Sequence, residues 1–480
     1  MSREAQHESL APTGIRRPLT RRRMLGTGVA ATVLVATGAT GTIAANAAER
    51  TAPRGVLPSA RRGLAFLDAA MDAYPDKGTV RLAQSYTDQA GLFSSAFTYD
   101  NAIAILAYLA AAAGATADAS ATSRATALGD ALLYAQAHDP QYTDGRLRQA
   151  YNVGPYTFYD GSAQPDGFVK ADGSANVGTQ FGFTGTATGD MAWAGIALTA
   201  LYRATRAAKY LDGALKIGTW IVTNTKTAEP LGGWKFGVDG QGAHHPGTAT
   251  EHNIDLIAFF GGLYKATGKS VWNDRRWRAQ AFVKKMWEPQ GGFFYTGTND
   301  GVTINKALVP EDTQTWSYLA LGAQLYASSV DWCATSLKVS DDSTRTNSTV
   351  PAGQSYAGVT FTSASLLANE DAPIAQYQPK PDRNGVWFEG TAHLALALRS
   401  RGHRGDEAAA TALLTSIESA QSQLGGDQQL GGKALPAQSG IVSASSPIDT
   451  GFGFGYYPYK HTGATAWYLL AKNRANPLRG

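Results

Sequence analysis

The sequence has little of the chemistry that would tie it to a disulfide framework or a thiolate metal site. Cys333 is the single cysteine in 480 residues, so an internal disulfide and CxxC metal sites are excluded. We expect Cys333 to pack as a small buried hydrophobic residue. No HExxH or other recognised metal-ligand spacing occurs, so we expect neither a metal ion nor another cofactor.

A basic surface is also missing once the N-terminus is set aside. The chain holds 42 Lys and Arg against 38 Asp and Glu, but residues 1–48 account for six of the arginines and two of the acids. The remaining chain is neutral, with 36 residues of each sign. Without a basic field to hold a phosphate backbone, we expect no nucleic-acid partner. Nucleotide-binding glycine loops and the GxSxG serine elbow are missing in their required contexts, which leaves phosphoryl transfer and serine hydrolysis unsupported.

The N-terminus has the three parts of a secretory signal. TRRRML at 20–25 precedes an uncharged segment from Leu25 to Ala48, which ends in a small-x-small site at 45–47. Gly and Thr interrupt this segment, so it is too weakly apolar for a stable membrane span. Arg21-Arg22, followed by Arg23, Met24 and Leu25, resembles a twin-arginine export signal. The resemblance implies a bacterial protein secreted in folded form, with residues 1–48 removed and no membrane anchor.

The rest of the chain, 49–480, has no Pro- or Ser-rich linker and is predicted to form a single, monomeric domain. Helical periodicity recurs throughout it. Six segments are apolar nearly all round, as helices buried on most faces are: 97–114, 188–204, 250–268, 311–327, 386–402 and 460–473. Six amphipathic segments alternate with them: 59–74, 121–137, 209–224, 273–287, 328–339 and 405–422.

Alternation of six buried and six amphipathic helices predicts an all-α protein with an inner ring inside an outer ring. An open α-solenoid is the rival architecture, but such proteins repeat at about 34–47 residues, shorter than the spacing here. GGWKFGV at 232–238 and GGFFYTG at 291–297 follow outer helices and predict short β-hairpins. Both hairpins would lie at the end of the ring where the inner helices begin, which we call the mouth.

Polar residues of the buried helices crowd into the first turn, and all six first turns would face the mouth. A single acid there can be a helix cap. Together they are harder to explain, because Asp255 and Glu389 are followed by continuous apolar helix and burying an unpaired carboxylate is costly. The predicted set comprises Asp100, Asp190, Glu251, Asp255, Asp312 and Glu389, with His252 and His461.

Clustered carboxyls at helix N-termini suggest acid/base catalysis. The helix dipole keeps one carboxylate ionised, while crowding and burial let another hold a proton near neutral pH. Two carboxyls with separated pKa values are what glycoside hydrolysis requires. Sugar rings stack on aromatic faces, and several aromatic residues stand beside the acids or on the predicted hairpins: Tyr99, Trp193, Trp234, Phe294, Trp316 and Trp387.

These segments resemble the six-hairpin (α/α)6 glycosidase superfamily over about residues 56–475, through TYDNA (98–102), TGDMAW (188–193), TEHNID (250–255), EDTQTW (311–316) and WFEGTAH (387–393). The resemblance implies an (α/α)6 toroid acting as a glycoside hydrolase on a poly- or oligosaccharide, with an inverting acid/base pair. It assigns no individual role. From the residues, we rank Glu389 and Glu251 as proton donors and Asp312 and Asp100 as bases. Asp190, Asp255, His252, His461 and the aromatic residues would bind substrate.

Three alternatives stay open. The same toroid is found in sugar epimerases and polysaccharide lyases, for which His252, His393 and His461 with Tyr459 would be acid/base residues; the mouth carries mainly acids and one lysine, Lys460, which disfavours an anionic polysaccharide. A metal site from Glu251, His252 and Asp255 has no recognised spacing. A non-catalytic glycan-binding protein or protein-binding scaffold is the third alternative.

Overall fold

Twelve α-helices in two concentric rings form the fold. The computed structural model describes residues 58–113, 119–179 and 182–479; the predicted signal peptide at 1–48 lies outside them. The inner ring comprises α3 (Thr98–Ala113), α5 (Thr188–Thr205), α7 (Thr250–Thr267), α9 (Glu311–Leu321), α11 (Phe388–Arg401) and α13 (Thr462–Lys472). The outer ring comprises α2 (Pro58–Met71), α4 (Ala119–Ala137), α6 (Ala208–Asn224), α8 (Ser270–Lys285), α10 (Ala327–Ser336) and α12 (Asp406–Gln423).

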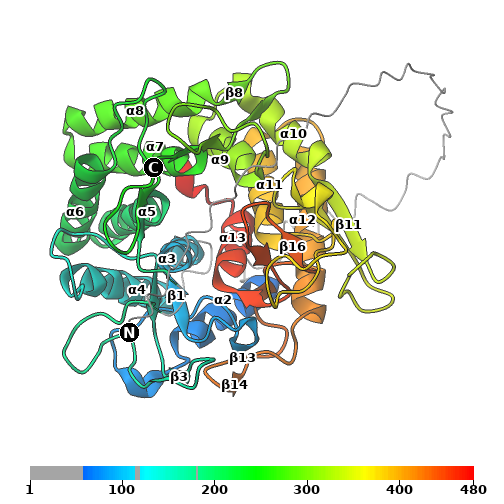
Figure 1. Ribbon diagram of the computed structural model, residues 1–480, viewed down its shortest axis with the longest axis horizontal. Coiled ribbons are helices and arrows are strands. Elements are labelled where there is room, and N and C mark those ends of the chain that lie inside the picture. Colours follow the sequence, from blue (N-terminus) through cyan, green and yellow to red (C-terminus); the bar gives the residue numbers. More distant parts are fainter. Residues whose placement is uncertain (1–57, 114–118, 180–181, 480) are drawn as a thin grey trace, which may run out of the picture. The chain divides into compact units, whose positions relative to one another are not determined.

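The ring is closed. Each inner helix contacts the next in the order α3, α5, α7, α9, α11, α13 and back to α3, and each outer helix packs on one inner helix (Figure 1). The first described helix, α2, packs against the last inner helix, α13. The predicted (α/α)6 toroid is confirmed, and the open solenoid is wrong.

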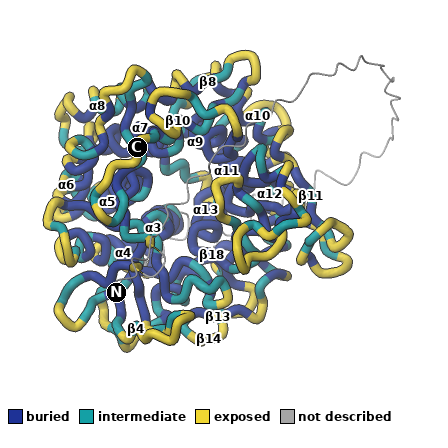
Figure 2. The backbone as a smooth tube through the Cα atoms, in the orientation of Figure 1, coloured by how far each residue is buried: buried dark blue, intermediate teal, exposed yellow. Residues whose placement is uncertain are grey.

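Hydrophobic patterning explains which helix lies in which ring. α5 is buried along most of its length, whereas α6 buries one stripe that includes Tyr210, Ala214, Ile217 and Ile221, at helical spacing. Figure 2 shows the inner helices mostly buried, with exposed residues concentrated on the outer helices and loops. Among the described residues, none of the helices combines the length and the apolar character needed to cross a membrane.

One inner helix is shorter than predicted. The apolar pattern at 311–327 predicts one helix, but α9 ends at Leu321 because Gly322 adopts a left-handed conformation, with φ of 61°. Its N–H donates to the carbonyl of Tyr318, a common glycine helix ending. A 3-10 turn at Gln324–Tyr326 then leads into α10.

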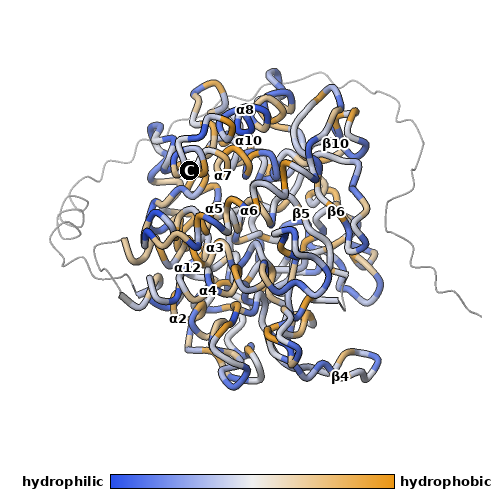
Figure 3. Tube along the Cα trace, turned by 90° about the vertical axis from the view of Figure 1, so that its left-hand side faces the viewer, coloured by the Kyte–Doolittle hydropathy of each residue, from blue (hydrophilic) through white to orange (hydrophobic). Residues whose placement is uncertain are grey.

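Short strand pairs tie the mouth together in a sixfold pattern. The residues that enter each inner helix pair with the chain leaving an outer helix: β1 (Ser95–Phe97) with β2 (Ala150–Asn152), β5 (Thr186–Ala187) with β6 (Gly237–Val238), β7 (Thr248–Ala249) with β10 (Gly297–Thr298), Pro310 with Thr362, Trp387 with Ala444, and His461 with Tyr86. The side view places β5, β6 and β10 to one side of the helices (Figure 3). All six inner helices therefore begin at one end of the ring.

The two predicted hairpin segments follow this pattern closely. Trp234 lies opposite Lys226, and β9 (Phe293–Phe294) pairs with β8 (Trp287–Glu288), so each segment first folds back on the chain just upstream. Each then ends at a glycine, Gly237 or Gly297, that pairs with the strand entering the preceding inner helix. A Cβ on either glycine would lie 2.2 Å from a carbonyl oxygen across the pair, which explains the choice of glycine.

The remaining short elements fill the connections. Strand pairs are β3 (Tyr156–Thr157) with β4 (Ala163–Gln164), β11 (Lys338–Asp342) with β12 (Ser355–Val359), β13 (Gln429–Leu430) with β14 (Lys433–Ala434), β15 (Ile441–Val442) with β18 (Lys460–His461), and β16 (Ile448–Asp449) with β17 (Gly455–Tyr456). Other 3-10 turns lie at Pro75–Lys77, Asp88–Ala90, Ser365–Leu367 and Pro477–Arg479. The stretch at 140–187 holds β2 to β5.

Candidate active site

The six inner helices begin in a common register. The N–H of the first residue of each donates to a backbone carbonyl of the strand that follows an outer helix, from Thr98 to Gln149 and equivalently in the other five. Equivalent positions therefore lie at equivalent depths in the ring. The second position is Tyr99, Gly189, Glu251, Asp312, Glu389 and Gly463; the third begins with Asp100, Asp190 and His252. Most of the predicted acids thus occupy two adjacent layers at the mouth.

The fourth position of each helix has a structural role. Asn253 accepts a hydrogen bond from the Trp234 N–H at 3.0 Å and donates to the Trp234 carbonyl at 3.1 Å. In every inner helix the side chain at this position accepts from the backbone after an outer helix, through Asn101, Met191, Asn253, Gln314, Thr391 and Thr465. These side chains satisfy buried backbone groups and fix each mouth strand to its helix.

The sixth position forms an aromatic floor below the mouth. Trp193, Trp316 and Trp467 lie with ring centroids 5.2–5.7 Å apart, and His393 packs 4.2 Å from Trp467. Asp255 occupies the same layer on α7.

Most of the predicted sugar-stacking residues are buried in the protein. Trp193 is 1% exposed, Trp316 5%, Trp234 1% and Trp387 2%, and Phe294 is fully buried. The prediction that they stack on sugar is corrected, because neighbouring rings and the mouth strands cover them. Tyr99 alone of this group stays half-buried.

The first carboxyl group is the Glu251 cluster, which we define as Asp190, Glu251, Asp255 and Asp312. Glu251 hydrogen bonds to Asp312, and burial together with Asp312 raises the pKa of Glu251 well above its usual range. Burial raises the pKa of Asp312 to about 6, against the lowering effect of its bond with Glu251. Burial and Asp100 raise the pKa of Asp190 to about 8. Glu251 thus holds a proton that Asp312 accepts.

Glu251 is also open to solvent. A third of its side-chain surface, 33%, is exposed, whereas Asp312 is 5% exposed and Asp255 1%. Burial and the charges of Glu251 and Asp312 raise the pKa of Asp255 well above its usual range, so Asp255 is a protonated group below the mouth. Glu251 is therefore the member of the cluster that combines a held proton with access from outside.

The second group is the His461 cluster, which we define as Tyr99, Asp100, Glu389 and His461. Both carboxylate oxygens of Asp100 lie 3.1 Å from His461 Nε2, and Glu389 Oε2 lies 3.4 Å from His461 Nδ1. The Tyr99 hydroxyl donates to Glu389 Oε1 at 2.6 Å and accepts from the Trp467 indole at 2.9 Å. These contacts join α3, α11 and α13.

The charged groups of the His461 cluster shift one another's pKa values. Burial lowers the pKa of His461, but the effect of Asp100 and Glu389 is larger and opposite, so the pKa is raised overall. Burial raises the pKa of Glu389 to about 7, while His461 and the Tyr99 hydrogen bond oppose that rise. Neutral His461 caps α13 by accepting from the N–H of Ala464 at 3.3 Å; when protonated, its Nδ1–H faces Glu389. Glu389 can therefore change charge near neutral pH.

Gly463 makes room for this cluster. A Cβ at this position would lie 2.6 Å from Asp100 Oδ1, 2.7 Å from His461 Cε1 and 3.0 Å from Glu389 Oε2. Glu389 Oε2 has no hydrogen-bond partner among the described residues. Two carboxylate oxygens and an imidazole therefore converge on the position that a side chain would fill.

His252 contributes through packing more than through charge. It is 7% exposed, its Nε2 lies 3.4 Å from Glu251 Oε1, and its ring packs 4.5 Å from Phe236. Burial lowers its pKa to about 3, so it stays neutral beside Glu251. The absence of a side chain at Gly189 allows this packing, since a Cβ there would lie 2.4 Å from the His252 ring.

A buried dyad that the sequence does not predict lies behind Glu389. Glu311 Oε2 lies 3.0 Å from His393 Nδ1, and His393 Nε2 lies 3.8 Å from Glu389 Oε1. Burial raises the pKa of Glu311 and lowers that of His393, so the dyad carries no net charge. Glu311 resembled a helix-capping acid, and the helical spacing of Glu389 and His393 was the signal that could have linked them.

Tyr456 and Tyr86 are further residues that the sequence analysis did not single out. Tyr86 stacks on His461 at 4.1 Å, and Tyr456 stacks on Trp387 at 5.5 Å. Burial raises the pKa of Tyr456 well above its usual range, as do the nearby charges of Glu389, Asp100, Asp312 and Glu251. Tyr456 is therefore within electrostatic reach of both carboxyl clusters.

The structure brings all eight predicted polar residues to one end of the ring, seven of them in two clusters on different helices and His252 beside Glu251. The Glu251 cluster comes from α5, α7 and α9, and the His461 cluster from α3, α11 and α13. The part of the chain that the structure describes has no group of three or more acidic, His or Cys side chains placed to hold a metal ion. What the two clusters can do is proton transfer, with a proton held at Glu251 and a base near neutral pKa at Glu389.

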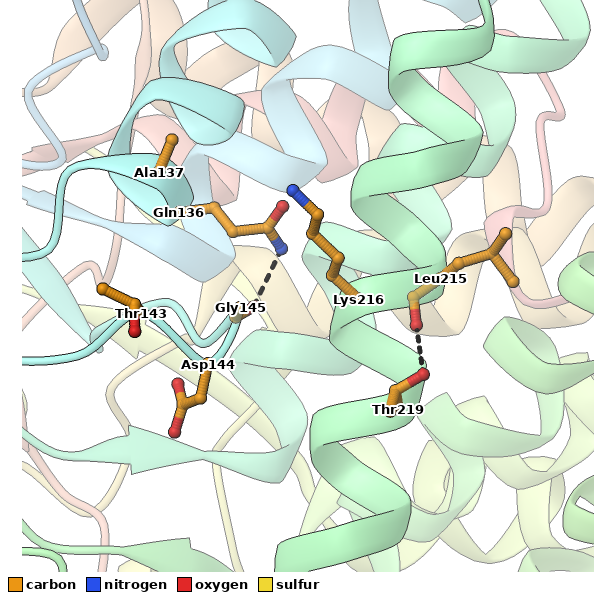
Figure 4. Close-up of a pocket in the computed structure, with 8 residues that line it drawn as sticks. All are labelled: Gln136, Ala137, Thr143, Asp144, Gly145, Leu215, Lys216 and Thr219. Atoms are coloured by element: carbon orange, nitrogen blue, oxygen red, sulfur yellow. Dashed lines mark hydrogen bonds between the residues drawn. The ribbon is translucent and has the colours of Figure 1, made fainter.

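A groove on the outer ring lies elsewhere. It has a volume of about 500 Å³ between α4 and α6 and is lined by Gln136, Thr143, Asp144, Lys216 and Thr219, among others (Figure 4). Gln136 and Thr219 are tied to backbone carbonyls of Gly145 and Leu215. No member of the two carboxyl clusters lines it, so it does not share their chemistry.

Comparisons with known proteins support the fold. No family model matches the sequence, and no curated protein matches it. A sugar epimerase from a ruminal bacterium superposes with a TM-score of 0.56 and 11% identity, covering 86% of this chain and 97% of that one. A D-mannose isomerase gives 0.57 and 11%, covering 88% and 96%. A family 76 glycoside hydrolase, a mannosidase from Bacteroides thetaiotaomicron, gives 0.51 and 10%, covering 87% and 98%. At these identities the likeness shows the shared (α/α)6 toroid alone.

Proposed function

We propose that this protein is a glycoside hydrolase that cleaves a poly- or oligosaccharide with a carboxyl pair, by inversion. The observation that carries the proposal is the separation of the mouth acids into two clusters with different proton occupancy. One cluster presents a protonated, solvent-reachable carboxyl at Glu251. The other contains Glu389, whose pKa of about 7 suits a general base. Glycoside hydrolysis needs both on opposite sides of one bond.

In this mechanism Glu251 donates its proton to the leaving glycosidic oxygen. Asp312 is the hydrogen-bond partner of Glu251. Its negative charge stabilises the Glu251 carboxylate left after proton transfer less than a neutral residue would. Glu251 therefore readily takes up a new proton from solvent. Glu389 in its ionised form accepts a proton from the attacking water. Tyr99 and His461 stabilise that ionised form through a hydrogen bond and a charge at 3.4 Å.

This assignment sharpens the sequence-based ranking. Glu251 keeps its role as proton donor, but Glu389 becomes the base, because hydrogen-bond donors and an imidazole surround it. Asp312 supports the acid, and Asp100 holds His461 in place. Asp190 and Tyr456 are the residues best placed to bind sugar hydroxyls, since both are partly exposed and Tyr456 is within electrostatic reach of both clusters.

A sugar epimerase or isomerase is the second candidate. It is favoured by His461, an imidazole held between two carboxylates with a raised pKa, and by the sugar epimerase and D-mannose isomerase that share the fold. Against it, the acid/base group that is open to solvent at the mouth is a carboxyl, Glu251, whose side chain is 33% exposed, whereas His393 is fully buried among the tryptophans of the floor.

The deciding experiment incubates the mature protein with aryl glycosides, soluble polysaccharides and reducing mono- and disaccharides. Proton NMR of the fresh products identifies hydrolysis and the anomer released, or epimerisation without cleavage. We expect hydrolysis with inversion, abolished in Glu251→Gln and Glu389→Gln and unchanged in the exposed Glu229→Gln control. Release of an epimer at intact linkage, with loss of activity in His461→Gln but not in Glu251→Gln, contradicts the proposal in favour of the epimerase. Binding without turnover of any sugar favours a non-catalytic glycan-binding protein.

Secretion and a monomeric state belong to the same proposal. The basic and apolar parts of residues 20–48 support export, and a polymeric substrate is encountered outside the cell. Replacing Arg21 and Arg22 with lysine should retain the protein in the cell if the signal is of the twin-arginine type. Size-exclusion chromatography with light scattering tests the monomer.

A further inference from the structure

Two exposed phenylalanines stand at the tip of the β16–β17 hairpin. Phe452 is 46% exposed and Phe454 48%, in a tip whose sequence is TGFGFG. Glycines at 451, 453 and 455 flank the two rings and add no side chains that could cover them. The hairpin was not predicted from the sequence, and the carboxyl chemistry described above leaves these rings unused.

The two rings continue an aromatic path that starts at the carboxyl clusters. Tyr456 packs 5.3 Å from Phe361, which in turn lies 4.6 Å from Trp387. Phe452 and Phe454 lie 6.2 Å and 6.3 Å from Phe361, at interplanar angles of 78° and 63°. Phe361 and Trp387 are buried, whereas the two outer rings stay about half exposed. The aromatic path therefore runs from buried rings near the mouth to exposed rings at the hairpin tip.

The hairpin tip is held firmly in place. Thr450 donates a hydrogen bond from its hydroxyl to the Phe454 carbonyl at 2.6 Å, and Thr362 donates to the Thr450 carbonyl at 3.0 Å. Ser365 donates to the Asp449 carbonyl at 2.7 Å. A Cβ on Gly451 would lie 2.7 Å from the Ala364 side chain, so the tip rests directly on the neighbouring loop. The rings are presented on a fixed support, which lowers the entropy lost on binding.

Chemistry of the surroundings indicates the ligand. Residues 448–459 contain no Lys or Arg, and their one charged group is Asp449. An anionic partner is therefore disfavoured. Half-exposed aromatic rings, next to hydroxyl-bearing Tyr456, suit a neutral molecule that has apolar faces and polar edges, which describes a pyranose ring.

We propose that Phe452 and Phe454 form an outer subsite that binds a pyranose unit at a distance from the bond that is cleaved. The substrate is accordingly a chain of several sugar units, not a monosaccharide or disaccharide. The proposal rests on the proposed function for the position of the cleaved bond, but the binding itself does not require catalysis.

The test compares wild type with the double variant Phe452→Ala/Phe454→Ala. A matched control, Trp277→Ala, removes an exposed aromatic ring, 51% exposed, from outer helix α8. Substrates are di-, tetra- and hexasaccharides of the polysaccharide cleaved in the panel. In the wild type, a bound sugar buries two half-exposed rings. Loss of this burial in the double variant should raise KM for the hexasaccharide about tenfold, with kcat unchanged. The disaccharide, too short to reach the subsite, should show no change.

Binding is measured independently by affinity electrophoresis in native gels containing mannan, xylan, barley β-glucan or dextran. Retardation of the wild type that is lost in the double variant and kept in Trp277→Ala supports the subsite even if no sugar is hydrolysed. Equal retardation of all three proteins, or an equal KM rise for disaccharide and hexasaccharide, overturns it. Circular dichroism and thermal unfolding of the double variant establish that the fold is intact, and Phe452→Tyr/Phe454→Tyr, which keeps the rings, should restore binding.

Discussion

Adding one methyl group at Gly463 tests the arrangement of the His461 cluster. Gly463→Ala places a Cβ 2.6 Å from Asp100 Oδ1 and 3.0 Å from Glu389 Oε2, whereas an ordinary contact begins at 3.4 Å. The Asp100 oxygen must therefore move by about 0.8 Å, which separates it from His461. Asp100 positions His461 beside the proposed base Glu389, and a misplacement of about 1 Å away from the reacting atoms can cost roughly 100-fold in rate, so we expect kcat to fall by about that factor.

Stability should change much less than activity. Alanine in place of a helical glycine is favourable by about 0.5–1 kcal/mol, while complete loss of a buried ion pair costs about 3–5 kcal/mol. With the pair weakened but not removed, we expect a net loss of about 1–3 kcal/mol in the free energy of unfolding. Gly261→Ala is the matched control. Its nearest neighbour would be the Arg276 side chain at 3.5 Å, so the helix should gain about 0.5–1 kcal/mol and activity should not change.

Two assays separate the outcomes. Urea unfolding measures stability, and NMR titration of ¹³C-labelled histidine follows His461, whose pKa is raised by Asp100 and Glu389. In Gly463→Ala that pKa should fall toward the ordinary value for histidine, because the partners have moved away. The reasoning is refuted if the variant keeps both the wild-type titration of His461 and the wild-type kcat, since the cluster would then tolerate a displacement that the geometry forbids.

Three other perturbations follow from the same geometry. Tyr99→Phe removes a donor that lowers the pKa of Glu389, so the acid limb of the pH–rate profile should move to higher pH if Glu389 acts as base; an unmoved limb contradicts that role. Asn253→Ala leaves the backbone of Trp234 unpaired in the core and should lower the free energy of unfolding in urea by about 2–4 kcal/mol. A loss below about 0.5 kcal/mol would show that these two hydrogen bonds are dispensable. Asp190 keeps its proton in the folded state up to about pH 8 but loses it near pH 4 when unfolded. Its contribution to stability is therefore complete below pH 4 and is lost as pH rises to 8, so thermal unfolding of Asp190→Asn should depend less on pH across this window than wild type.

Helix positions and ring order could be read from the sequence because they depend on one kind of signal. A helix apolar on all sides must be buried, and a helix with one apolar stripe must cover it, so the alternation fixes which ring each helix joins. The acids in the first turns also followed, since equivalent helices begin at one end. The boundary of α9 did not follow, because apolar residues continue beyond Gly322 and the left-handed turn there is decided by one glycine.

The pattern of apolar and polar residues does not show how deep in the ring each side chain lies. Trp193 and Glu251 lie four residues apart in register, yet one belongs to the floor and the other to the mouth. Hydrophobicity shows that both helices are buried, but it does not show in which layer of the ring each residue lies. Asn253 lies in the same polar turn as Glu251, yet its side chain bonds the backbone of Trp234, which sequence pattern alone does not show. The exposure of Phe452 and Phe454 depends on the β16–β17 strand pair. That pair has no turn signature like that of the Gly-Gly segments, so the sequence does not predict it.

Closure of the ring by α2 and α13 has a consequence for the order in which the protein becomes competent. α13 supplies Gly463 and Trp467, and the residue before it is His461, so one of the four members of the His461 cluster and part of the floor come from the last inner helix. Until this helix docks between α11 and α3, the ring has a gap, and α2 lacks its partner. Acquisition of the site therefore requires α13, and a chain cut before residue 461 lacks both His461 and the Trp467 part of the floor.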